Sequence, residues 1–240
     1  MGSWEGRVFR TVRSGPTSPH CACPSRALST IGPIGPIFLA VEEVTGLART
    51  PTPGGRDRLL ASAGRLFEEH GVHTVGLQQI IDDCGCGKQM LYREFANKDD
   101  LVAAWLQECI GRWAAAVELA TASLADDPAG QLVAIVKVSA DDATSSGFRG
   151  CPVRSTQAEF RDAAHPVHKI AVDHLTAVRK HLRDLADQAG AADPAQLADR
   201  LMLVIDGLLT NGAVLGPNGS AAAAVDLAAD IVEVGTRRPR

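Results

Sequence analysis

The chain has 240 residues, 45% of them hydrophobic and 22% charged, which excludes a wholly disordered protein. Its 24 Lys and Arg residues against 28 Asp and Glu residues give a net charge of −4. This charge excludes a polycation that holds nucleic acid by bulk charge, but it allows a local basic patch. The sequence has no run of about 18 uncharged apolar residues, which a membrane span requires, and no signal-peptide core. We therefore expect a cytoplasmic protein with no membrane partner.

Residues 1–55 differ in composition from the rest of the chain. They hold seven of the 13 prolines and show no sustained helical period. Such a segment cannot bury enough apolar surface to fold by itself. We expect a disordered N-terminal extension over 1–55.

From Arg56 onward, apolar residues recur with helical spacing. A first stripe ends at Gly71, and a second, short stripe ends at Gly85, since glycine is a common helix stop. A third short helix is expected to begin near Lys88. The first two stripes consist of Leu59, Leu60, Ala63, Leu66 and Phe67, and of Leu77, Ile80, Ile81 and Cys84.

The later helices have readable starts. Asn97 is a favourable N-cap for a long helix, with Asp99 and Asp100 in its first turn. Proline, which the first helical turn tolerates, follows Asp127, His165 and Asp193. The last two helices are expected at about 194–215 and 220–234. Because no segment alternates with period two, the prediction is an all-α fold of about nine helices.

Residues 77–95 have the layout of a helix-turn-helix: a two-turn helix, a tight Gly-Cys-Gly corner and a second short helix. An α-helix fits the major groove of B-DNA, where its leading residues meet base edges and its neighbours grip phosphates. The second helix would lead with Lys88, Gln89 and Met90. The expected DNA-binding residues are Gln78, Gly87, Lys88, Gln89, Met90, Tyr92, Arg93 and Lys98.

The segment from Arg58 to Gly71 and the Leu-Tyr-x-x-Phe-x-x-Lys-x-x-Leu run that begins at Leu91 resemble the N-terminal domain of TetR-type (tetracycline-repressor-like) regulators. The resemblance implies that Tyr92 and Lys98 hold phosphates and that Phe95 fills the small core. It also implies a three-helix DNA-binding domain over 56–102, with its motif at about 75–95. A helical effector-binding and dimerisation domain would follow over 103–236.

Four positions depart from the family pattern, and at the first of them Ile81 stands where a small alanine is usual. Gly87 replaces the serine or threonine that commonly caps the recognition helix, and Gln89 and Met90 stand where Gly-Thr is frequent. The operator sequence therefore does not follow from relatives.

The second domain resembles the family more loosely. The resemblance implies a cavity for an unidentified small-molecule effector and a homodimer formed through about 194–234. Ala, Leu, Val and Ile residues in the last two helices suit a two-fold helical interface. The candidate cavity residues are Trp105, Trp113, Phe148, Phe160, His174 and Met202.

The six cysteines are expected as thiols, because a chain that is not exported lies in a reducing compartment. Cys84 and Cys86 are expected as buried filler, with a thiol or metal sensor as the alternative. A cysteine-dependent enzyme built on Cys151 is disfavoured, because no motif places a basic partner and no nucleophile elbow is present. We expect no enzyme activity, no cofactor and no metal site.

These patterns together predict a ligand-responsive, DNA-binding transcriptional regulator. In the favoured version it is a repressor that a small molecule releases from a palindromic double-stranded operator. The alternative is a dimeric ligand-binding scaffold whose DNA recognition has decayed at Gly87, Gln89 and Met90. Binding to a pool of random-sequence DNA separates the two hypotheses.

Overall fold

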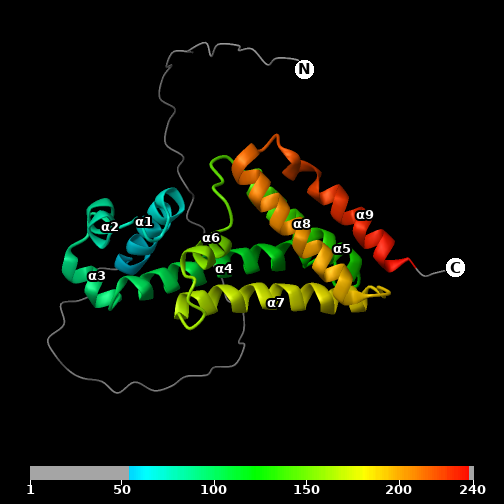
Figure 1. Ribbon diagram of the computed structural model, residues 1–240, viewed down its shortest axis with the longest axis horizontal. Helices are drawn as coiled ribbons and strands as arrows, with labels where there is room; N and C mark the ends of the chain where they lie inside the picture. The colour runs from blue at the N-terminus through cyan, green and yellow to red at the C-terminus, as the bar shows by residue number, and fades with distance from the viewer. Residues whose placement is uncertain (1–53, 238–240) are drawn as a thin grey trace, which may run out of the picture. The chain divides into compact units, whose positions relative to one another are not determined.

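The computed structural model describes residues 54–237, which form nine α-helices, one short 3₁₀ helix and no strand (Figure 1). This confirms the predicted all-α class. The expected extension over 1–55 lies outside the described residues except for its last two positions. The helices are α1 (Gly55–His70), α2 (Leu77–Cys84), α3 (Lys88–Glu94), α4 (Lys98–Thr121), α5 (Pro128–Ala143), α6 (Pro152–Glu159), α7 (Pro166–Gln188), α8 (Pro194–Leu215), η1 (Ser220–Ala223) and α9 (Ala224–Thr236).

Side-chain caps fix several helix starts where the sequence predicted them. The Asn97 carboxamide oxygen accepts the Asp100 backbone N–H at 2.8 Å and begins α4. Asp127 and Asp193 do the same before α5 and α8, each followed by proline. The expected last helix at 220–234 instead begins with the 3₁₀ turn, and α9 starts at Ala224.

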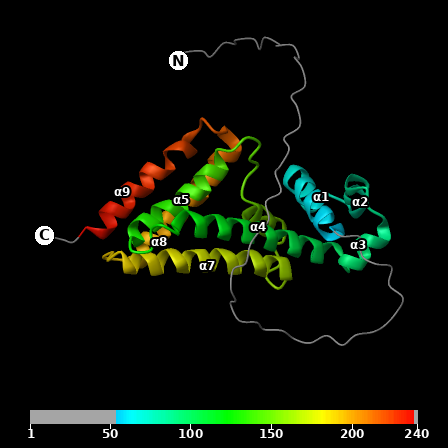
Figure 2. The same cartoon turned by 180° about the vertical axis from the view of Figure 1, so that it is seen from behind.

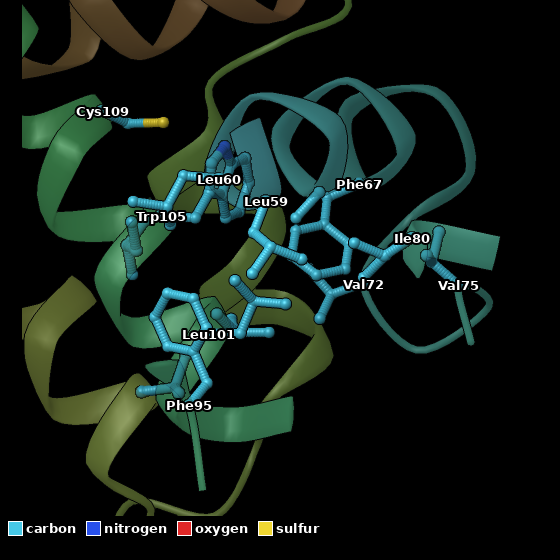
Figure 3. Packing of buried hydrophobic residues seen from close by; sticks show 14 of the residues in the cluster. Leu59, Leu60, Phe67, Val72, Val75, Ile80, Phe95, Leu101, Trp105 and Cys109 are labelled. Carbon is cyan, nitrogen blue, oxygen red and sulfur yellow. The ribbon is translucent and has the colours of Figure 1, made fainter. Parts of the chain in front are cut away.

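The first hydrophobic core joins α1, α2, α3 and the first half of α4 (Figure 3). Leu59, Ile80, Leu91 and Leu101 are fully buried in it. Phe95 is 3% exposed, so it packs in this core as the sequence resemblance implied. The same core continues into the start of α7 through Val167 and Ala171.

A second core lies among α5, α8, α9 and the far ends of α4 and α7. Leu132, Ile135, Leu182 and Leu201 are fully buried there. The two views of the ribbon agree that α4 runs from the α1–α3 end of the chain to this second group of helices (Figures 1 and 2). The expected domain boundary at 102 therefore falls inside a continuous 24-residue helix.

Over residues 54–237, none of the helices is both long and apolar enough to cross a membrane.

Leu101→Ala tests the first core. Leu101 is 0% exposed, so truncation leaves a cavity and should lower the free energy of unfolding by about 2–5 kcal/mol. Leu119 on the same helix is 81% exposed, and Leu119→Ala should change stability by about 0.5 kcal/mol or less. Urea denaturation followed by circular dichroism measures both variants. Equal losses would contradict the assigned packing.

Candidate nucleic-acid interface

Helices α2 and α3 form the helix-turn-helix. Gly85 ends α2 with φ of +62°, a left-handed conformation that glycine adopts without strain. The Cys86 backbone N–H then donates to the Ile81 carbonyl at 3.1 Å, which closes the end of α2. Gly87 precedes α3 without any side-chain cap. The corner therefore has the geometry that the Gly-Cys-Gly sequence predicted.

One set of expected DNA-binding residues lies exposed on α3: Lys88, Gln89, Tyr92 and Arg93. Tyr92 is 49% exposed, and the Lys88 ammonium lies 5.8 Å from the centre of its ring. The Arg93 guanidinium contacts the Glu94 carboxylate at 3.2 Å, an exposed pair that a phosphate can readily replace. Apart from this pair, the exposed side of α3 presents one further cation, Lys88, and the phenol of Tyr92.

Gln78 and Gly87 are exposed at the starts of α2 and α3. The Gln78 amide donates to the Asp82 carboxylate at 2.8 Å, which leaves its second N–H and its oxygen available for DNA. Asp83, the neighbouring acid, pairs with Arg65 on α1, and this contact holds the pKa of the Asp83 carboxyl below its usual value. The acids on α2 are thus engaged by residues of the domain itself.

Met90 and Lys98 are less accessible than the sequence suggested. Met90 is half-buried, and a Cβ atom on Gly55 would lie 2.7 Å from its sulfur, so Met90 packs on the first turn of α1. Lys98 is also half-buried, and burial lowers the pKa of its ammonium although Glu159 and Asp99 oppose the shift. Met90 thus packs α3 on α1, and Lys98 at the start of α4 is only partly accessible to DNA.

The cysteines at the corner differ from the expected thiols. Cys84 and Cys86 are joined by a disulfide across Gly85. Their Cα atoms are 5.2 Å apart, within the range that a disulfide spans, because the left-handed Gly85 turns both side chains to the same side. Cys109 and Cys151 are free, whereas Cys21 and Cys23 lie outside the described residues. Within residues 54–237, no group of three His, Cys, Asp or Glu side chains could hold a metal ion.

A cavity of about 670 Å³ lies among α4, α5, α6, α7 and α8. Its volume falls in the range of small-molecule sites. Four of the six expected residues line it: Trp113, Phe148, His174 and Met202.

Trp105 and Phe160 lie outside the lining of this cavity. Trp105 is 3% exposed and packs edge-to-face on Phe67, because Gly64 leaves room for its indole. Phe160 contacts the rings of His73 and His165 in tilted geometry, with ring centres 4.8 and 4.6 Å away. Both rings therefore pack where α1–α4 meet α6 and α7.

Sequence reasoning assigned no role to Glu159, although it joins the two halves of the molecule. This carboxylate at the end of α6 accepts the backbone N–H groups of Val72 and His73, at 2.9 and 2.6 Å. The His73 ring in turn lies 3.0 Å from the Glu159 carbonyl oxygen. The partners are 86 and 87 residues apart in sequence, so no local pattern could indicate this contact.

Known proteins resemble both parts of the chain. The sequence family described as bacterial regulatory proteins, tetR family, matches residues 59–105. SCO4454, a TetR-family transcriptional regulator from Streptomyces coelicolor, is 31% identical, with a TM-score of 0.69 over 76% of this chain and 94% of that one. The HTH-type transcriptional regulator BetI of Burkholderia ambifaria is 28% identical over 184 residues, 75% of this chain and 92% of the relative.

A third similarity is shorter. The HTH-type transcriptional activator FasR of Mycolicibacterium smegmatis is 32% identical over 79 residues, so the match spans 36% of that protein. The likeness to SCO4454 extends over almost its whole length and agrees with the helix-turn-helix and the helical second half described above. This chain belongs to the TetR family of bacterial regulatory proteins and is a transcriptional regulator with a DNA-binding helix-turn-helix.

Proposed function

We propose that the chain is a homodimeric repressor that binds a palindromic operator through α3 and is released when a small molecule occupies the cavity. The position of α6 supports the proposed response to a ligand. One end of this eight-residue helix lines the cavity, and its other end holds the DNA-binding domain. A ligand that displaces the first end therefore acts on the second.

The cavity end of α6 consists of Pro152, Val153 and Arg154, with Cys151 just before the helix. The opposite end carries Glu159, whose carboxylate holds the loop between α1 and α2 through Val72 and His73. Because a two-turn helix moves as a unit, a shift of Val153 is transmitted to Glu159. The loop that Glu159 holds leads directly into α2, the first helix of the helix-turn-helix.

Helix α4 supplies a second connection. Cys109 and Trp113 in its middle line the cavity, while its first turn carries Lys98 and Asp99. The His165 ring at the start of α7 lies 3.2 Å from the Asp99 carboxylate. Displacement of α4 or α7 by a ligand would thus also move the first turn of α4, next to the recognition helix.

The coupling free energy that the switch requires is similar to the free energy of the hydrogen bonds that Glu159 accepts. To reduce operator occupancy from 99% to 1%, an effector must prefer the non-binding state by about 5.5 kcal/mol per dimer, or about 2.7 kcal/mol per site. Hydrogen bonds to a charged group contribute about 1.5–3 kcal/mol each. Loss of the two that Glu159 accepts would be enough for this coupling.

The outer faces of α8 and α9 support the dimer. Leu203 and Val214 on α8 are 71% and 76% exposed, and Leu227 and Val234 on α9 are 50% and 62% exposed. Large apolar side chains exposed together mark protein interfaces. Packing of these two helices against a second copy would bury them in a two-fold, four-helix contact. A dimer would also present two copies of α3 to grooves about 34 Å apart on one face of DNA.

Leu203→Glu should weaken the dimer. Each dimer would bury two such leucines, so two charges in their place should raise the dissociation constant about 100-fold or more. Leu119→Glu replaces an 81% exposed leucine on α4, outside the proposed interface helices, and as the matched control it should leave the dimer intact. Sedimentation equilibrium measures both. A dimer of unchanged affinity in Leu203→Glu would place the interface elsewhere.

DNA selected from a random-sequence pool tests the recognition helix. Arg93→Ala should weaken binding to every sequence and lower the slope of log affinity against log salt by about one, because one phosphate contact is lost. Gln89→Ala should instead change the preferred bases, with a loss of about 1–3 kcal/mol in discrimination. Arg183→Ala, an exposed arginine on α7, is the control. If Arg93→Ala and Arg183→Ala behave alike, α3 is not the DNA-binding element.

Hydrogen exchange tests the transmission through α6. Operator binding should change the protection of the Cys151, Val153 and Arg154 amides, because the two ends of α6 are coupled. In Glu159→Ala this response should disappear, and the amides of Val72 and His73 should exchange faster. Gln157→Ala, on the same helix but outside the contact between Glu159 and the loop, should respond like the unchanged protein. An undiminished response in Glu159→Ala would exclude this route.

A further inference from the structure

The charges around the cavity leave its half-buried walls electrically neutral. Seven acidic or basic side chains line it, and five of them are exposed: Glu68, Arg112, Asp141, Asp142 and Arg149. Partial burial raises the pKa of the Asp142 carboxyl, although Arg112 opposes this shift. The other two, Arg154 and Asp206, are half-buried and pair with each other through two hydrogen bonds of 3.0 and 2.5 Å. Neither of these two ions is therefore free to balance the charge of a ligand.

A charged ligand would be costly in this position. A buried ion without a counter-charge loses its hydration without compensation, and to break the Arg154–Asp206 pair would leave one of those groups unpaired. An uncharged ligand avoids both losses. The paired arginine and aspartate thus favour a neutral molecule.

The other lining residues include aromatic and apolar side chains as well as Ser139, Ser145 and Ser146. Trp113 and Phe148 line the cavity together with Met202. The Trp113 indole N–H donates to the Ser139 hydroxyl at 3.4 Å, which fixes the plane of the ring. Aromatic rings and a thioether pack well against a flat ring, in offset-stacked or edge-to-face geometry.

His174 supplies the polar group. Its ring meets Trp113 edge-to-face, with ring centres 5.5 Å apart and planes at 87°. Burial lowers the pKa of His174, so its imidazole is neutral near pH 7, with one donor and one acceptor nitrogen. In the described part of the chain, no backbone or side-chain group hydrogen-bonds to this ring. A neutral imidazole of this kind suits a ligand hydroxyl, which both donates and accepts.

From this arrangement we infer that the cavity takes an uncharged aromatic molecule that carries a hydroxyl group, with its ring against Trp113 and its hydroxyl on His174. This inference rests on the proposed ligand response of the same cavity and adds the chemical class of the effector.

Three probes with the same ring system test the charge. Calorimetric titration of the full chain without DNA compares 1-naphthol, the anion 1-naphthoate and the cation 1-naphthylmethylammonium. At pH 7, 1-naphthol should bind at least tenfold more tightly than either ion. Tighter binding of the anion, pointing to Arg112 and Arg149, or of the cation, pointing to Glu68 and Asp142, overturns the inference. Absence of binding by all three also overturns it.

A variant pair tests the hydroxyl contact. In the unchanged protein 1-naphthol should bind at least fivefold more tightly than 1-methylnaphthalene, which lacks the hydroxyl. His174→Phe keeps an aromatic ring but loses both nitrogens, so this advantage should vanish while binding of 1-methylnaphthalene persists. Persistence of the fivefold advantage in His174→Phe would overturn the assignment. Val178→Ala, one turn further along α7 in the same lining, is the control and should keep the advantage.

A separate measurement concerns the proposed function itself. Fluorescence anisotropy of labelled operator, with and without 1-naphthol, reports release from DNA. Calorimetric binding with no release contradicts the proposed repressor switch but supports the ligand class. Normal DNA binding with no calorimetric signal for 1-naphthol contradicts the ligand class alone. The two failures are therefore distinguishable.

Discussion

The Glu159 carboxylate at the end of α6 joins the second half of the molecule to the loop after α1. Two N–H groups of that loop donate to it, and His73 and Phe160 pack beside it. A carboxylate that accepts two backbone donors is held in position and direction, which a purely apolar contact would not ensure. Through it, the short helix α6 connects the cavity walls to the first helix of the helix-turn-helix. The proposed switch therefore depends on the position of Glu159 as the last residue of α6.

Much of the fold could be predicted because its determinants are local. The Asn97 cap, the proline after Asp127 and Asp193, and the left-handed Gly85 each act on neighbouring residues. Contacts between distant segments could not be predicted in this way. Trp105 and Trp113 both belong to the stripe of apolar residues that recurs every fourth residue along α4. Only Trp113 lines the cavity, because Trp105 packs on α1, where Gly64 leaves room for its indole. Periodicity shows which residues are buried, but the partner helix decides what they bury against.

The two ends of the molecule differ in how charge is used. On α3 the cations are exposed, which suits a polyanion whose counterions are released on binding. Around the cavity the half-buried Arg154 is already neutralised by Asp206. Under the two proposals, the same residue types would serve opposite purposes: exposed charge on α3 would attract DNA, and the Arg154–Asp206 pair would disfavour ionic ligands in the cavity. This contrast follows from burial, since the energy of an unpaired ion rises steeply as water is removed.

Thermodynamic coupling of the cavity and the operator site through α6 requires reciprocity between the two binding events. Titration of 1-naphthol into the protein alone and into its complex with operator DNA gives two ligand affinities. Coupling requires operator DNA to weaken ligand binding by the same total factor by which the ligand weakens operator binding. We expect operator DNA to weaken 1-naphthol binding, and 1-naphthol to weaken operator binding, by the same large factor. In Glu159→Ala this factor should be small. Identical ligand affinities with and without operator would contradict this coupling.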